Sequence, residues 1–255
     1  MDQFDRYLDG RLWFWEGDLG QAKQIFEAML ELFPETTPAS RLLESDLALI
    51  DLEERLAAGE TVALDFEPEM MLWDIRSGDW TVNDAGELEF QFGDQTGFFR
   101  IVSRVRLGRD FEMSGELACD KLKKQHLEFG PMVGCHRNRE GEQWISCLCE
   151  REFWGQWYFD LLDRTFASNF DGKRRGLKVK EGNVFSFRLV VNDGRISYWM
   201  NDLQIIDNHE PGFYHKEGTS DIDISDNDPA GIFLSSRWSS ARATVRNLTV
   251  RKSSD

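Results

Sequence analysis

The sequence predicts a mainly β protein, a two-layer antiparallel β-sandwich of the jelly-roll type, preceded by a short α-helical hairpin segment. Apolar residues recur every three or four positions up to Gly59, which is helical spacing. After Gly59 they alternate with polar residues, which is strand spacing. Two dipeptides typical of tight hairpin turns, Asp193-Gly194 and Asn201-Asp202, separate the clearest alternating stretches. We therefore expect two domains, residues 1–60 and 61–255.

The first segment, residues 1–60, is predicted to be helical. An apolar helix face runs up to Pro34, which ends that helix. A further helix is predicted to begin with Thr37 as its N-cap and Pro38 at its first helical position. It continues to Gly59, a residue suited to the C-terminal cap.

The spacing of small and aromatic residues in residues 3–36 resembles a tetratricopeptide repeat, which is a hairpin of two helices. The residues at the positions of that motif are Gly10, Trp13, Gly17, Ala22, Phe26 and Pro34. Met29 departs from it, because the family usually has Ala there. A single repeat cannot bury its own apolar face, so the resemblance implies a cover from the helix near Pro38 or from repeats upstream. The alternative is an ordinary helical hairpin that packs on the next domain.

Residues 61–252 are predicted to contain ten to fourteen strands with almost no helix between them. The clearest stretch, residues 183–206, alternates around the two turn dipeptides and predicts a meander of three antiparallel strands. In the last strand the apolar positions shift by one around Asn247, which indicates a β-bulge.

The order of four patterns in this region resembles a concanavalin A-like lectin/glucanase domain. The patterns are G-D-W-T-V-N-D-A-G-E-L-E-F, F-E-M-S-G-E-L, F-R-L-V-V-N-D-G-R-I-S-Y-W-M-N-D and the closing A-G-I-F-L-S-S with R-N-L-T-V-R. The resemblance covers residues 61–252 and is nearest to the laminin-G-like and 3-keto-disaccharide hydrolase branches. It implies a lectin-like sandwich that either recognises carbohydrate or acts on it.

The segment E-F-W-G-Q-W-Y-F, residues 152–159, carries large aromatics on both faces of any regular strand. A sandwich strand needs apolar side chains on one face only, so one set of rings is predicted to lie on the free face or under a cover. The candidate ligand-binding residues are Trp154, Trp157, Tyr158, Arg237 and Trp238. Rings that stack on sugar C–H faces, beside polar groups for the hydroxyls, suit carbohydrate. Core packing and contact with a protein partner remain the alternatives.

Catalytic residues are not predicted. Retaining glucanases of the resembled fold place carboxylates in an E-x-D-x-x-E arrangement on one strand, and this arrangement is absent. Glu150 and Glu152 are the nearest equivalent, with one as acid and the other as nucleophile, but an outward charged strip at a strand end explains them as well. Whether the protein is an enzyme is therefore left open, with binding favoured over catalysis.

No cofactor or metal ion is predicted. Asp221 and Asp223 lie at strand spacing and, with Asp226 and Asp228, present oxygen ligands of the kind Ca²⁺ prefers. A solvated acidic loop is the favoured interpretation. The four cysteines, which include the C-L-C pair at 147–149, are predicted to be small buried apolar residues.

The formal net charge of −16 argues against nucleic acid and anionic membranes as partners. No apolar stretch of about 18 residues and no secretion signal is present, so a cytoplasmic location is the default expectation, for a chain that is also compatible with being a fragment of a larger protein. The predicted function is non-catalytic recognition of carbohydrate. A sugar-active hydrolase of the 3-keto-disaccharide type and a protein–protein assembly module are the alternatives.

Overall fold

The computed structural model describes most of the chain. The described residues are 3–33, 37–66, 72–91, 97–120, 126–138, 141–151, 157–163, 168–170, 184–210, 224–225, 228–237 and 242–253. The chain divides into two compact units, Met1–Glu60 and Thr61–Asp255.

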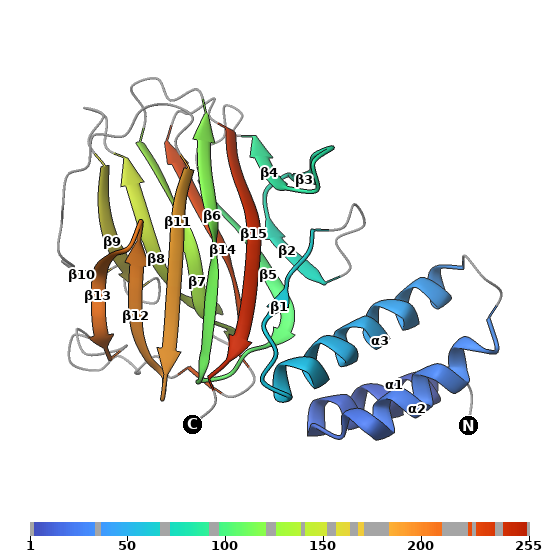
Figure 1. Cartoon of the computed structure of the whole chain (residues 1–255). Coiled ribbons are helices and arrows are strands. Elements are labelled where there is room, and N and C mark those ends of the chain that lie inside the picture. Colours follow the sequence, from blue (N-terminus) through green and yellow to red (C-terminus); the bar gives the residue numbers. More distant parts are fainter. Residues whose placement is uncertain are drawn as a thin grey trace. The chain divides into compact units, whose positions relative to one another are not determined.

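The first unit consists of three helices (Figure 1). They are α1 (Gln3–Glu16), α2 (Leu19–Leu30) and α3 (Pro38–Ala57). The predicted start of α3 is confirmed, since Thr37 accepts a hydrogen bond from the Ser40 amide at 3.1 Å and Pro38 follows it. Gly59 follows the end of α3 with φ of +80°, and its amide donates to the Leu56 carbonyl, as expected of a terminating glycine.

The packing of the helices of the first unit includes a close approach at Gly10 and a buried, paired carboxylate at Asp46. A side chain at Gly10 would meet the ring of Phe26 at 2.5 Å, so the absence of one lets α1 and α2 lie close together. Asp46 of α3 is buried, and its carboxylate accepts hydrogen bonds from Tyr7 and Arg11 of α1 at 3.0 and 2.8 Å. The buried carboxylate is thereby paired, as a charge inside a protein requires.

One face of α1 carries large apolar side chains that are exposed. They recur at spacings of four, four and three residues, which places them along one stripe. The stripe consists of Phe4 (66% exposed), Leu8 (48%), Leu12 (54%) and Trp15 (58%). We call it the α1 stripe.

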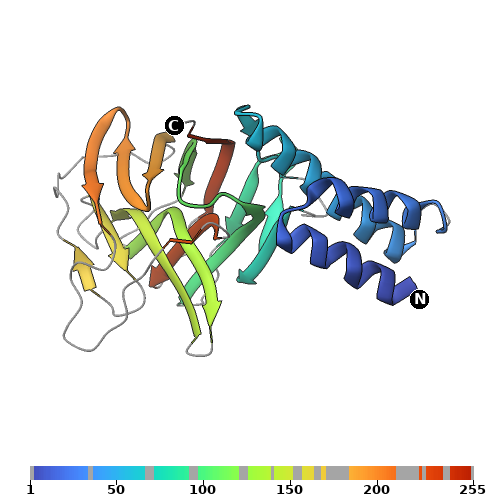
Figure 2. The same ribbon diagram turned by 90° about the horizontal axis from the view of Figure 1, so that it is seen from below.

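The second unit is a sandwich of two antiparallel sheets, seen from two directions in Figures 1 and 2. The eight-stranded sheet has the order β13 (Leu203–His209), β12 (Arg195–Met200), β11 (Val184–Asn192), β6 (Phe111–Asp120), β15 (Arg242–Lys252), β4 (Leu88–Gln91) and β3 (Trp80–Val82), and β1 (Val62–Ala63) also pairs with β15. The predicted fold class is therefore confirmed.

The seven-stranded sheet forms the other layer. Its order is β10 (Ser168–Phe170), β9 (Trp157–Asp163), β8 (Gly141–Arg151), β7 (His126–Asn138), β14 (Pro229–Arg237), β5 (Gly97–Arg106) and β2 (Trp73–Ser77). The described residues of the two sheets form fifteen strands, one more than the upper limit predicted, and the shortest of these is the two-residue β1.

The predicted turns and bulge are confirmed by the backbone. Asp193 and Gly194 have φ of 46° and 72°, and Asn192 pairs with Arg195 across them, which is a two-residue hairpin. Asn201 and Asp202 form the next turn, with φ of 48° and 63°. In β15 the register shifts between Arg246 and Thr249, as the apolar pattern around Asn247 predicts.

Aromatic side chains join the two sheets in the core. The rings of Phe129 (β7) and Phe185 (β11) meet edge to face with centroids 6.1 Å apart. The rings of Phe90 (β4) and Phe99 (β5) lie 4.6 Å apart. These contacts identify the inner face of each sheet, so residues of opposite parity on the same strands belong to the outer face.

The outer faces of the two sheets differ. In β11, buried residues alternate with less buried ones, as in a strand that faces solvent on one side. In the seven-stranded sheet, by contrast, consecutive residues are all buried at 129–134 in β7, 144–147 in β8 and 231–234 in β14. The centre of this sheet is therefore covered on both faces.

The backbone at the centre of the seven-stranded sheet is also tightly packed. A side chain at Gly231 of β14 would meet the Ile101 carbonyl oxygen of β5 and, at 2.8 Å, the terminal carbon of Met132 of β7. Only glycine fits between these two neighbours.

Candidate functional site

The covered outer face of the seven-stranded sheet carries an apolar cluster. It consists of Val102, Met132, Trp144 and Phe233, from four different strands, and each of these residues is at most 6% exposed. Cys135 packs against it. The residues lie on the side of their strands opposite the aromatic core contacts, so this is a second packed layer, which we call the outer cluster.

A cation covers the indole of the outer cluster. The guanidinium carbon of Arg100 lies 4.2 Å from the centroid of the Trp144 ring, and the Phe233 ring lies 6.2 Å from it. At this distance the positive charge is attracted to the indole face. Because Arg100 occupies that face, Trp144 is not a platform for a ligand in this arrangement.

Two buried polar atoms beside this stack have no hydrogen-bond partner among the described residues. They are Nε1 of Trp144 and Oγ of Ser146, which lie two residues apart on the same face of β8. A buried polar group without a partner costs about 1–3 kcal/mol, so such groups are rare and need an explanation. A ligand hydroxyl or an ordered water is the kind of group that would pair with them.

Beyond the outer cluster, the strand register brings polar and aromatic residues into one row. Tyr158 of β9 pairs with Glu150 of β8, Glu150 pairs with Glu128 of β7, and Glu128 pairs with Ser235 of β14. Glu128 is half-buried, whereas its neighbour Phe129 is fully buried in the core. Among the residues of this row, Glu128 is thus the one whose burial the structure describes, and it is less buried than the centre of the sheet.

Three of the sequence-predicted ligand residues lie at one end of the seven-stranded sheet. β9 begins at Trp157, next to Tyr158, and β14 ends at Arg237, which pairs with His126. β8 and β7 lie between β9 and β14, so the two chain segments are separated by three strand spacings, about 14 Å. Residues about eighty positions apart in the sequence thus share one end of one sheet.

Other predicted residues lie outside the described part of the chain or have a different role. Trp154, Trp238 and Glu152 are outside the described residues, as are Asp221, Asp223 and Asp226. Asp228 is buried, and its carboxylate accepts a hydrogen bond from the Ser225 amide at 2.9 Å. Its backbone carbonyl accepts from the amides of Leu107 and Gly108, so this aspartate holds a turn.

The sequence interpretation did not identify Arg100, Glu128, Trp144 and Ser146. A signal for two of them was present, because the shared face inferred for Cys147 and Cys149 places Trp144 and Ser146 together on the opposite face of β8. Nothing in the sequence marked Glu128, because its partner Glu150 lies on another strand.

The described residues offer no metal centre. Within those ranges, no group of three or more His, Cys, Asp or Glu side chains is arranged to hold a metal ion. Cys147 is fully buried, and burial raises the pKa of its thiol far above the usual value, as expected of a structural cysteine. In the portion of the chain that the structure describes, no helix combines the length and apolar character needed to cross a bilayer.

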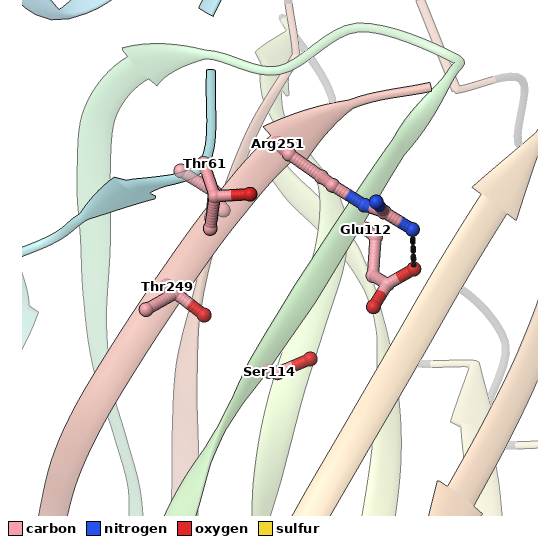
Figure 3. A pocket seen from close by; sticks show the side chains of 6 residues that line it. Thr61, Glu112, Ser114, Thr249 and Arg251 are labelled. Atoms are coloured by element: carbon pink, nitrogen blue, oxygen red, sulfur yellow. Dashed lines mark hydrogen bonds and ion pairs between the residues drawn. The ribbon is translucent and has the colours of Figure 1, made fainter. Parts of the chain in front are cut away.

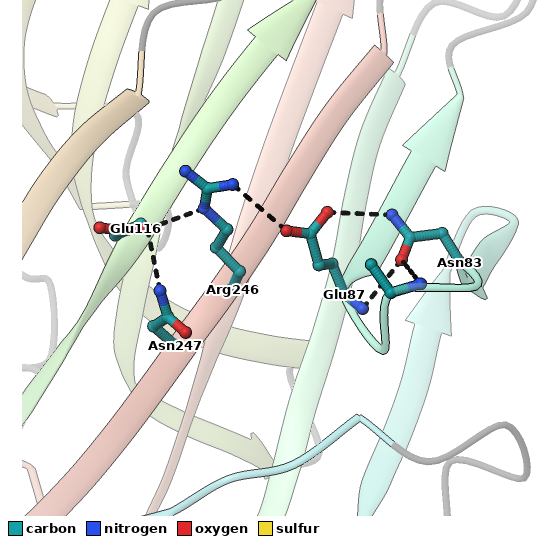
Figure 4. Close-up of polar contacts among 6 residues, drawn as sticks. Asn83, Glu87, Glu116, Arg246 and Asn247 are labelled. Atoms are coloured by element: carbon teal, nitrogen blue, oxygen red, sulfur yellow. Dashed lines mark hydrogen bonds and ion pairs between the residues drawn. The ribbon is translucent and has the colours of Figure 1, made fainter.

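The outer face of the eight-stranded sheet is built from ion pairs instead. Arg246 of β15 donates to Glu116 of β6 at 2.7 Å and to Glu87 at 3.3 Å (Figure 4). Glu87 in turn accepts a hydrogen bond from Asn83 at 3.0 Å, and Asn247 donates to Glu116 at the same distance. The charges on this part of the face are satisfied by one another.

Glu112 is the most heavily paired carboxylate on this face. Arg188 contacts both of its oxygens, at 2.9 and 3.0 Å, and Arg251 donates to one of them at 2.9 Å. The hydrogen bond from Arg188 lowers the pKa of Glu112, partial burial opposes that shift, and the hydrogen bond from Arg251 lowers the pKa further.

Comparisons of the sandwich with solved structures identify its class. A carbohydrate-binding module of family 66 from Bacillus subtilis superposes with a TM-score of 0.51 at 13% identity, over 71% of this chain and 96% of the module. A Bacillus subtilis protein of unknown function with a galectin-like fold gives a TM-score of 0.54 at 9% identity, over 75% and 96% of the two chains. The second unit is thus a lectin-like jelly roll.

A further similar structure comes from work on endo-acting O-glycanases, which members of the human gut microbiota express to initiate mucin breakdown. It gives a TM-score of 0.53 at 9% identity, over 76% of this chain and 99% of that one. At these identities the likeness concerns the fold alone. No protein-family model and no curated protein matches the chain.

Replacing Ser146 by Ala is expected to raise the free energy of unfolding by about 1 kcal/mol, because it removes a buried hydroxyl that has no partner in the described part of the chain. Urea denaturation followed by tryptophan fluorescence measures the change. Ser103→Ala is the matched control, since that hydroxyl is equally buried but accepts a hydrogen bond from the Val105 amide at 3.0 Å. It should lose about 1 kcal/mol. An equal loss in both variants would contradict the unpaired state of Ser146.

Replacing Glu112 by Gln is expected to lower the free energy of unfolding by about 1 kcal/mol at about pH 7. The pKa of Glu112 is depressed in the folded state, so its stabilising effect is present above the pKa of an unfolded carboxyl, about 4.3. The effect is lost as the pH falls through the folded pKa. Denaturation of wild type and variant from about pH 7 to about pH 2.5 should show the difference disappear on acidification. A difference independent of pH refutes the assignment.

Proposed function

We propose that the chain is a non-catalytic carbohydrate-recognition module that binds through one end of its seven-stranded sheet. The proposal is carried by the strand register, in which the positions of Tyr158 and Arg237 share the outer face at that end with Glu128, whereas Trp157, next to Tyr158, has the parity of the inner face. This set combines a flat apolar ring with a carboxylate and a guanidinium, and these are the groups that recognise the C–H faces and hydroxyls of sugars. Trp154 and Trp238 are proposed as further stacking residues.

The length of the row across the sheet supports a ligand longer than one sugar. The row that contains Tyr158 and Glu128 crosses four neighbouring strands, about 14 Å. A chain of two or three sugar rings has about that extent. Because the outer cluster closes the centre of the sheet, we expect an extended ligand to make several shallow contacts along the row.

The carbohydrate proposal predicts that Tyr158→Ala abolishes binding on a glycan array, because the substitution removes a ring worth about 1–3 kcal/mol of burial. The melting temperature is expected to change little. Arg237→Ala should weaken the same signals by about tenfold or more, as a charged hydrogen-bond donor is lost.

Trp15→Ala is the matched control for these variants, since it removes an exposed indole from the helical unit. It should leave glycan binding unchanged. If the wild-type protein binds no glycan, or if the variants at the sheet end unfold the sandwich, those rings belong to the core and the proposal is wrong.

A sugar-active hydrolase of the 3-keto-disaccharide type is the second candidate, favoured by one observation. Glu128 and Glu150 occupy directly opposite positions on neighbouring strands. Directly opposed positions have Cβ atoms about 5 Å apart, a spacing at which two carboxyl groups can act as acid and nucleophile on a glycosidic bond. Glu152, two residues after Glu150 in the sequence, is proposed as a further carboxylate for such a reaction.

A protein-assembly role for the helical unit is the third candidate. The α1 stripe exposes four large apolar side chains on one helix face, and exposed apolar patches mark sites of protein contact. A tetratricopeptide-like hairpin, as the spacing from Gly10 to Pro34 resembles, would cover such a face with the helix of another repeat. This role is compatible with carbohydrate binding by the other unit.

The assembly proposal predicts that the double variant Leu8→Glu and Leu12→Glu lowers the mass measured by light scattering at about 50 μM protein, because charges replace an apolar contact. Gln3→Glu and Arg6→Gln, on the same helix but off the stripe, form the matched control, because together they also change the charge by −2. A wild-type protein that is monomeric at this concentration and captures no helical partner excludes the stripe as a docking surface.

A further inference from the structure

A small polar hollow opens on the outer face of the eight-stranded sheet, away from the site proposed above. It has a volume of about 210 Å³ and lies where β1, β15 and β6 run side by side. Its lining consists of Thr61, Glu112, Ser114, Thr249, Val250 and Arg251. At about 30 Å³ for each water molecule, it has room for about seven waters, or about one sugar ring.

Three hydroxyl groups line this hollow. Figure 3 shows Thr61 and Thr249 on one side of it and the Glu112–Arg251 pair on the other, with Ser114 nearby on β6. The register explains the grouping, because Thr249 of β15 pairs with Ser114 of β6 in one row and Arg251 pairs with Glu112 in the next. Each hydroxyl both donates and accepts, so together they match a ligand that carries several hydroxyl groups of its own.

The charges beside the hollow do not cancel. Glu112 contacts two guanidinium groups, those of Arg188 and Arg251, so the three side chains together carry one surplus positive charge. Other described ion pairs of this face leave no such surplus: Arg242 pairs with Glu89, and Arg246 lies between two carboxylates. In a chain of net charge −16, this is a local site for a single negative charge.

Arg251 has hydrogen-bond donors that no described residue uses. Its Nη2 donates to Glu112, while Nε and Nη1 have no partner among the described residues. The side chain is half exposed, so these donors face accessible space. A guanidinium with two unused N–H groups in a fixed geometry is suited to a carboxylate, which accepts two parallel hydrogen bonds.

We propose that the hollow beside Arg251 binds an acidic sugar, with the hydroxyls of Thr61, Ser114 and Thr249 on the ring and the guanidinium of Arg251 on its carboxylate. A hexuronate combines the two features that the lining supplies, several hydroxyl groups and one negative charge. A highly charged ligand is disfavoured, because the surplus is a single charge on an acidic protein. The inference rests on the proposed sugar-binding function, to which it adds a ligand class and a second site.

Binding of sodium D-glucuronate to the intact chain, followed by calorimetry and by chemical shifts of the labelled protein, tests the inference. D-Glucose is the matched neutral sugar, and acetate is a carboxylate without a ring. We expect glucuronate to bind at least tenfold more tightly than either. Arg251→Gln should weaken glucuronate binding at least tenfold through loss of a charged hydrogen bond, and Thr249→Val should weaken it several-fold.

Two control variants share β15 with the tested residues. Arg242→Gln changes a guanidinium of the same face that pairs with Glu89, and Thr244→Val removes a hydroxyl of the same face outside the hollow. Neither should change glucuronate binding. Equal losses in Arg251→Gln and Arg242→Gln would indicate non-specific attraction and overturn the proposal. Acetate binding as tight as glucuronate binding would reduce the site to one for any small anion and also overturn it.

Tyr158→Ala separates this inference from the proposed function. If Tyr158→Ala removes the glycan-array signal while glucuronate still binds and requires Arg251, both proposals hold. If glucuronate binding instead depends on Tyr158 and not on Arg251, the second site is refuted and the first is supported. If glucuronate binding requires Arg251 while the glycan-array signal is unchanged in Tyr158→Ala, the proposed site on the seven-stranded sheet is wrong and the proposed site in the hollow is supported.

Discussion

The packing of aromatic rings between the two sheets is the interaction on which the rest of the sandwich depends. Phe129 against Phe185 and Phe90 against Phe99 set which side of each strand faces inward. Because side chains alternate along a strand, this choice assigns every other residue to an outer face. The outer cluster, the ion pairs of the eight-stranded sheet and the polar hollow all follow from it.

The outer faces of the two sheets differ in how their side chains are stabilised. On the eight-stranded sheet, carboxylates and guanidiniums pair across strands, and Glu112 and Glu116 hold neighbouring arginines in place. The seven-stranded sheet buries a second apolar layer around Trp144, at the cost of two polar atoms without partners. Such unpaired atoms are more often found where function has priority over stability, which is why this face is the better candidate for recognition.

Much of the fold is predictable from local pattern. The period of the apolar residues and the turn dipeptides predict the helical start, the meander around Asp193 and Asn201 and the bulge at Asn247, because each depends on residues close together in the chain. The covered face of the seven-stranded sheet was not predictable in this way. Residues 144–147 are all buried, but their sequence, Trp-Ile-Ser-Cys, does not by itself show whether one face or both faces of the strand are covered. That depends on the neighbouring layers.

The sequence by itself determined the composition of the candidate surface, namely the aromatic run around Trp157, the arginine at 237 and the acidic character of the chain. Only the tertiary structure decided which of these residues share a sheet end, and that Glu128 and Glu150 stand opposite one another. It also brought Thr61 and Arg251 to the same hollow as Glu112. The physical reason is that strand order and register arise from hydrogen bonding and packing between residues far apart in the sequence. The spacing of neighbouring residues along the chain does not specify them.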